Sequence, residues 1–218
     1  MARMLFDRDS TVLHLSLARR HERLARRYQQ NVLAAAILAA TNGLKTKHEL
    51  AGDRELDRQS AYDGVLAADG DLDDGFRGLF NSAENYDRDN VGARTLALLF
   101  PEGGFGSIID QPLAQEPSTA EAMATKVEGL EAGHPLAPHA AKLRTLAAGV
   151  REALTALDTA VRVQKSAEAE EELAQGVLRR QYEANYLDAR KALGRTIAER
   201  LFPRARTAGE APPAAPPA

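Results

Sequence analysis

Alternating aspartates near residue 70 have a spacing that resembles the start of a metal-binding loop. Asp69, Asp71 and Asp73 are separated by single residues, as at the beginning of a calcium loop, where carboxylate oxygens surround the ion. The rest of that pattern is missing, because its sixth position is Asp74 in place of glycine and its twelfth is Phe80 in place of glutamate. We keep the three aspartates as metal candidates but do not expect a bound metal.

Two Asn-Tyr pairs are the candidates for a small-ligand or cofactor site. Asn85-Tyr86 and Asn185-Tyr186 each precede an Arg-Thr and then a Leu-Phe-Pro, which ends at Pro101 in the first case and at Pro203 in the second. We interpret the two stretches as the ends of two related halves. If the halves arose by duplication, the pairs occupy equivalent positions and can line a central cavity. Otherwise the tyrosines lie at the edge of the core, with the ring inside and the hydroxyl outside.

No group of residues predicts catalysis, and we expect no cofactor. The chain has no cysteine, which excludes thiol chemistry, thiolate metal sites and disulfides. His14 and His21 are seven residues apart, about 10 Å along a helix, so they cannot share one ion. Glu131 and His134 have the spacing of a di-iron motif, but such sites need a second copy, which the chain lacks.

Composition predicts an all-α protein. Of the 218 residues, 44% are hydrophobic, 27% are charged and only 5% are aromatic, a balance that favours helix over sheet. The net charge of −3 does not support nucleic-acid binding. The longest apolar run, 32–40, is far too short to span a membrane, and the first residues lack a signal-peptide pattern. We therefore expect a soluble, cytoplasmic protein.

Apolar periodicity predicts a helical hairpin in the first half. One helix begins after Ser10, a plausible N-cap, and continues to Asn42-Gly43. A glycine-bounded turn over 43–52 leads to a second helix over 53–100, with a kink near Gly70 because glycine weakens a helix. In this hairpin the arginines of 19–27 lie opposite the aspartates of 69–74, which would leave no free basic patch for nucleic acid.

The second half begins after a Pro- and Gly-rich connection at 101–117. Ser118-Thr119-Ala120-Glu121 has the pattern of a capping box and predicts a short helix to about residue 132. A kink near Pro135 follows. From residue 138 the apolar stripe continues to 202, either with a turn within 164–170 or as one helix of about 60 residues that would need a coiled-coil partner. The Pro- and Ala-rich tail, 203–218, is expected to be disordered.

Together these observations predict a single domain, 1–202, built as an antiparallel up-down four-helix bundle. Its two hairpins, 10–100 and 118–202, can be duplicates of each other. Because these helices are longer than is usual in globular proteins, we expect a non-enzymatic structural or protein-interaction bundle that self-associates or joins a larger assembly. The alternative is a bundle that binds a metal or small ligand, either inside or at the Asp-rich kink.

Overall fold

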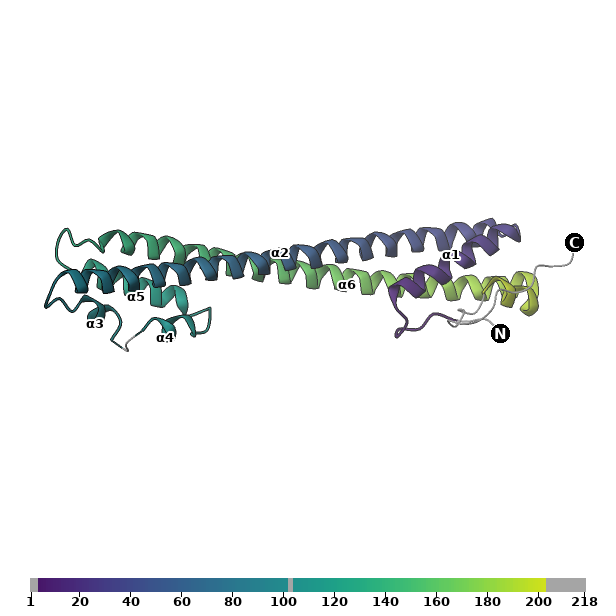
Figure 1. The fold of residues 1–218 in the computed structure, drawn as a ribbon. Coiled ribbons are helices and arrows are strands. Elements are labelled where there is room, and N and C mark those ends of the chain that lie inside the picture. Colours follow the sequence, from purple (N-terminus) through teal and green to yellow (C-terminus); the bar gives the residue numbers. More distant parts are fainter. Residues whose placement is uncertain (1–3, 102–103, 203–218) are drawn as a thin grey trace, which may run out of the picture. The chain divides into compact units, whose positions relative to one another are not determined.

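The computed structural model describes residues 4–101 and 104–202, apart from the side chains of Ser107 and Ile109. Over these residues the chain forms helices and no strand, which confirms an all-α fold. The helices, shown in Figure 1, are α1 (Thr11–Arg27), α2 (Asn31–Asp89), α3 (Thr95–Leu99), α4 (Gly106–Ile109), α5 (Glu116–Glu128) and α6 (Ala137–Leu201). The expected disordered tail, 203–218, lies outside the described residues.

The chain divides into two compact units. Unit 1 consists of Met1–Arg54 and Val163–Ala218, and unit 2 of Glu55–Arg162. Helices α2 and α6 each contribute one part to both units. Whether residues 1–202 behave as a single domain stays a prediction.

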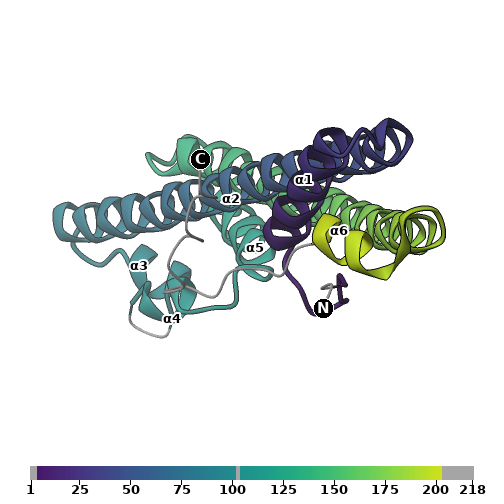
Figure 2. The same ribbon diagram turned by 90° about the vertical axis from the view of Figure 1, so that its right-hand side faces the viewer.

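Unit 1 is built from α1, the first part of α2 and the last part of α6. Lys47 Nζ lies 2.6 Å from Glu170 Oε2, and the Asn185 amide donates to the Leu33 carbonyl oxygen at 2.8 Å. Residue numbers therefore rise along α2 as they fall along α6, so the two helices are antiparallel here. Figures 1 and 2 both show α1 lying beside this pair. The buried core takes residues from all three helices: Leu17, Ala18 and Ala25; Leu33, Ala34, Ile37 and Leu44; Leu178, Tyr182, Ala189, Ala198 and Leu201.

The first chain reversal lies at residues 28–30, and the predicted turn at 43–52 is wrong. Gln29 has a left-handed backbone (φ 57°), and the Gln30 amide donates to the Ala25 carbonyl oxygen at 2.8 Å. This ends α1 without a glycine or a proline, so no residue in the sequence signals the turn. Residues 43–52 are helical instead, because burial of Leu44 and Ala51 outweighs the low helix propensity of the two glycines.

Unit 2 contains the rest of α2, the first part of α6, and helices α3 to α5. Here α2 continues through Gly70 without an interruption, so the helix is not broken where the kink was predicted. Gly75 lets α6 approach closely, since a Cβ at this position would lie 2.6 Å from the Leu146 Cδ1 atom. The core joins α2, α5 and α6 through Leu72, Phe76, Leu79 and Ala83; Ala120, Met123, Ala124 and Val127; and Ala140, Leu143, Ala147 and Val150.

The predicted break near Pro135 is confirmed. Residues 129–136 are not helical, and Gly133 has φ 80°. The capping box is wrong, because α5 already begins at Glu116 and Ser118 lies within its first turn. Glu121 instead binds Arg144 and Arg151 of α6.

Helix α6 has no turn at 164–170, so of the two expectations for this segment the single long helix is correct. Its one non-helical residue is Gly194 (φ 78°, ψ 166°). After this residue a short helical segment, residues 195–201, carries Leu201 and the following Phe202 into the core of unit 1. Leu99 and Phe100 are buried in the same way in unit 2, as expected for apolar anchors at helix ends.

The ion pairs identified for Arg26 and Arg77 do not include the expected pairing of the α1 arginines with the aspartates of α2. Helix α1 belongs to unit 1, whereas the aspartates belong to unit 2. Arg26 binds Glu22 of its own helix at 2.6 Å, and Arg77 binds Asp74 of α2. The α1 arginines therefore give no argument against nucleic-acid binding. The expectation that the chain does not bind nucleic acid rests only on its net charge of −3.

Among the described helices, none has a stretch long and apolar enough to cross a membrane.

Two substitutions test whether the chain reverses at residues 28–30, as observed, or at 43–52, as predicted from the sequence. Gln29→Gly removes a left-handed conformation from a side-chain-bearing residue, and Gly52→Ala adds a better helix former where no atom lies within 4 Å of the new Cβ. We expect each to raise the free energy of unfolding by about 0.5–1 kcal/mol, measured by urea denaturation. If residue 29 were helical and 43–52 a turn, Gln29→Gly would lower stability and Gly52→Ala would not raise it.

Candidate functional sites

A cluster of three carboxylates lies where α5 begins against α2 in unit 2. Asp69 and Asp73 are one helical turn apart, so they lie on the same face of α2. Glu116 is the first residue of α5. The packing of Ala120 and Met123 in the shared core holds this end of α5 on that face.

The carboxylate oxygens converge in a buried position. One oxygen from each of Asp69, Asp73 and Glu116 lies within 4.8 Å of the others, and the Glu116 residue is only 3% exposed. Asp69 Oδ1, Asp73 Oδ1 and Glu116 Oε2 are buried, and among the described residues none of these atoms has a hydrogen-bond partner. Buried polar atoms in folded proteins normally have a hydrogen-bond partner, so these three oxygens lack the donor or positive charge that would be expected beside them.

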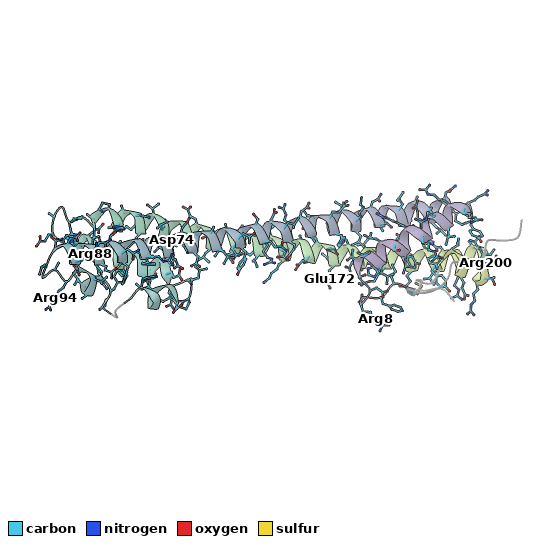
Figure 3. The ribbon with its side chains drawn as sticks, in the orientation of Figure 1. Arg8, Asp74, Arg88, Arg94, Glu172 and Arg200 are labelled. Carbon is cyan, nitrogen blue, oxygen red and sulfur yellow. The ribbon has the colours of Figure 1, made fainter. Side chains whose placement is uncertain are left out.

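Burial and mutual repulsion dominate the electrostatics of this cluster. Burial, then a carboxyl–carboxyl hydrogen bond with Asp69 that forms when one of the two groups is protonated, and then the charges of Asp69 and Asp73, raise the pKa of Glu116 to about 7. Burial, and then the charge of Asp69, also raises the pKa of Asp73, against the opposing charge of Arg77. The Arg77 guanidinium is bound to Asp74, labelled in Figure 3, and lies 5.6 Å from the centre of the Phe105 ring. Chemically, such a cluster can share a proton or surround a cation.

The sequence identified two of these three carboxylates. Asp69 and Asp73 come together, but as neighbours on a helix and not as ligands in a calcium loop. Asp71 is exposed and does not belong to the cluster. Glu116 was missed because it is 43 residues away in sequence from Asp73 and was expected to lie in a connection. The only local signal was the i, i+4 spacing of Asp69 and Asp73.

A second buried polar group, in unit 1, centres on His21 of α1. Its Nδ1 lies 3.0 Å from the Leu201 carbonyl oxygen, and its Nε2 lies 3.0 Å from the Asn185 amide nitrogen. These contacts fit a neutral imidazole that donates from Nδ1 and accepts at Nε2. The Asn185 amide also donates to the Leu33 carbonyl oxygen, and its own oxygen accepts from Gln181 at 2.9 Å.

The candidate Asn-Tyr pairs have different surroundings. Asn185 is buried at 1% exposure, whereas Asn85 is exposed. Tyr186 stacks edge-on against Phe202, and Tyr86 lies 4.3 Å, between ring centres, from His134. The first pair belongs to unit 2 and the second to unit 1. The hydrogen bonds of Asn185 join α1, α2 and α6, which assigns this side chain a structural role.

An apolar groove runs between α2 and α6 in unit 1. It is lined by Ala36, Ala39, Ala40, Gly43, Leu44, Lys47, Ala174, Val177 and Gln181. Next to it, Val32 is 82% exposed and Leu173 is 72% exposed, and Val177 itself is 50% exposed. Exposed apolar side chains gathered on one face typically mark a contact surface.

The His21 contacts predict how stability depends on pH. Burial lowers the pKa of His21 below its ordinary value of 6.5, so the unfolded chain takes up a proton more readily than the folded chain. The stabilisation from neutral His21 is complete above pH 6.5 and is lost as the pH falls from there towards the lower folded-state pKa. Protonation at Nε2 would also turn the acceptor for the Asn185 amide into a second donor.

We therefore expect the stability difference between the wild type and His21→Leu to shrink between pH 7.5 and pH 5. Urea denaturation at both pH values measures this difference directly, and the subtraction removes the contribution of groups that both proteins share, such as Glu116. A difference that stays constant over this range would show that His21 does not titrate with a lowered pKa.

No protein-family model matches the chain, and neither a curated protein nor a solved structure is similar to it.

Proposed function

We propose that this chain is a non-enzymatic structural protein that self-associates through the groove between α2 and α6 of unit 1. The observation that carries the proposal is the apolar face formed by the groove and by Val32, Leu173 and Val177 beside it. The cost of leaving this face in water is removed when a second apolar surface covers it.

The spacing along α2 supports a helical partner. Val32, Ala36, Ala39 and Gly43 recur at intervals of four, three and four residues, the pattern of a coiled-coil seam. Three of these residues are small, so a second helix can approach closely. Across the groove, α6 presents Val177 among the lining residues.

The features of this face favour a second copy of the same chain as the partner. It offers both a groove with a small-residue floor and the large apolar side chains that can fill one, so it suits a two-fold contact in which each copy gives and receives the same residues. Lys47, at the edge of this face, forms an ion pair with Glu170 at 2.6 Å. Because its charge is compensated in this way, it does not favour a partner of opposite charge. Two copies would bring four segments of α2 and α6 together, which differs from the four-helix bundle within one chain that the sequence predicted.

The buried histidine supports a non-enzymatic role. A general base must reach a substrate proton, but His21 is fully buried and both of its ring nitrogens are occupied by Leu201 and Asn185. The duplication of the two halves remains part of this proposal, supported by the burial of Leu99-Phe100 in one unit and of Leu201-Phe202 in the other.

Light scattering coupled to size exclusion tests self-association. We expect the wild type to have twice the 23.6 kDa mass of one chain at about 100 µM, and the mass to fall upon dilution, because dimer formation depends on concentration. Val177→Lys places a charge in the contact and should return the mass towards that of one chain.

The matched control for this variant is Val91→Lys. Val91 is fully exposed in the segment between α2 and α3 of unit 2, so the same substitution there should leave the mass unchanged. A wild type whose mass is 23.6 kDa at about 100 µM and after dilution would refute the proposal. A dimer whose mass falls equally with Val177→Lys and with Val91→Lys would also refute it.

A further inference from the structure

We propose that Asp69, Asp73 and Glu116 bind one divalent cation of the class that prefers oxygen ligands, namely Mg²⁺, Mn²⁺ or Ca²⁺. The site belongs to unit 2 and shares no residue with the groove of unit 1. It is therefore independent of self-association.

The distances allow all three side chains to reach one ion. Mg²⁺–oxygen bonds are about 2.1 Å long and Ca²⁺–oxygen bonds about 2.3–2.6 Å, so two ligand atoms on opposite sides of one ion are at most about 4.2–5.2 Å apart. The carboxylate oxygens of the cluster lie within 4.8 Å of one another. The 4.8 Å limit falls within the range for Ca²⁺, whereas the oxygens would have to move closer together around Mg²⁺.

The burial of Glu116 distinguishes this cluster from an ordinary acidic surface. The residue is 3% exposed, and its Oε2 atom has no hydrogen-bond partner among the described residues. The same is true of Asp69 Oδ1 and Asp73 Oδ1. A carboxylate held away from water needs a donor or a cation, and a single cation placed between the three oxygens would serve all of them.

The identified contacts of the basic side chains around the cluster do not fill this role, and Arg151 donates to the Pro117 carbonyl oxygen at 3.3 Å and not to Glu116. Arg77 follows Asp73 by one helical turn, but its guanidinium is bound to Asp74 and lies over the Phe105 ring. Arg144 and Arg151 of α6 are bound to Glu121, further along α5. The negative charges of the cluster therefore remain without a bound guanidinium from these residues.

The ligand atoms determine the class of metal. All of them are carboxylate oxygens, which suit Mg²⁺, Mn²⁺ and Ca²⁺, whereas thiolate and imidazole ligands suit Zn²⁺ and Cu²⁺ better. Three protein ligands leave coordination positions for water, as is usual for Mg²⁺. The ion would join the start of α5 to α2, since Glu116 belongs to α5 and the two aspartates belong to α2.

Isothermal titration of the metal-free full-length chain with Mn²⁺, Mg²⁺ and Ca²⁺, each added alone, tests the site. We expect one ion per chain, with a dissociation constant between about 10 µM and 1 mM for at least one of the three. Glu116→Gln and Asp73→Asn preserve shape but remove a ligand charge, so each should weaken binding at least about tenfold.

Asp71→Asn is the matched control, because Asp71 lies in the same acidic stretch but is exposed and outside the cluster. It should bind the ion as the wild type does. Equal weakening by Asp71→Asn and Asp73→Asn would indicate a diffuse acidic surface and would overturn the proposal. So would the absence of binding by all three ions, which would leave a proton shared between carboxyl groups as the counterpart of the cluster.

A measurement on the wild type keeps the test valid if a variant fails to fold. Mn²⁺ is paramagnetic and broadens the NMR signals of nearby amides. We expect substoichiometric Mn²⁺ to broaden the amide signals of residues 69–73 and of Gln115, Glu116 and Ser118 first, and an excess of Mg²⁺ or Ca²⁺ to restore them. Broadening that begins elsewhere in the chain would overturn the assignment of the site.

Discussion

The antiparallel packing of α2 against α6 is the contact on which each unit depends. A single helix cannot bury its own apolar face, so its stability comes from a partner. In unit 1 the partner surface is completed by α1, and in unit 2 by α5. Helix α2 can remain continuous through Gly52 and Gly70 because tertiary packing outweighs the modest cost of glycine in a helix.

Each unit buries polar groups, but their hydrogen bonding differs. In unit 1 the contacts of His21 and Asn185 are mutually satisfied: each donor meets an acceptor, and three helices are joined. In unit 2 the buried oxygens of Asp69, Asp73 and Glu116 are all acceptors when ionised, and a set of acceptors cannot satisfy itself. The first group therefore stabilises a fold, whereas the second is suited to an external proton or cation.

Prediction from the sequence succeeded where local chemistry decided the outcome. The helical composition, the break around Pro135 and the burial of Leu-Phe at two helix ends all follow from propensities and periodicity. It failed at the first reversal, because Gln29 carries no turn signal and the glycines of 43–52 do. The sequence identified Asp69 and Asp73 but not Glu116. Spacing along the chain predicts which residues share a helical face, but it does not predict which residue of another helix packs against that face.

Local sequence was enough to predict that the chain is helical, that the helices are interrupted near Pro135, and that acidic residues are concentrated near residue 70. The folded chain shows which of those residues are buried together, that His21 contacts Asn185, and that an apolar groove lies between α2 and α6. Helix formation depends on neighbours within a few residues, whereas burial and hydrogen bonding between helices depend on segments far apart in the chain, such as those of His21 and Asn185.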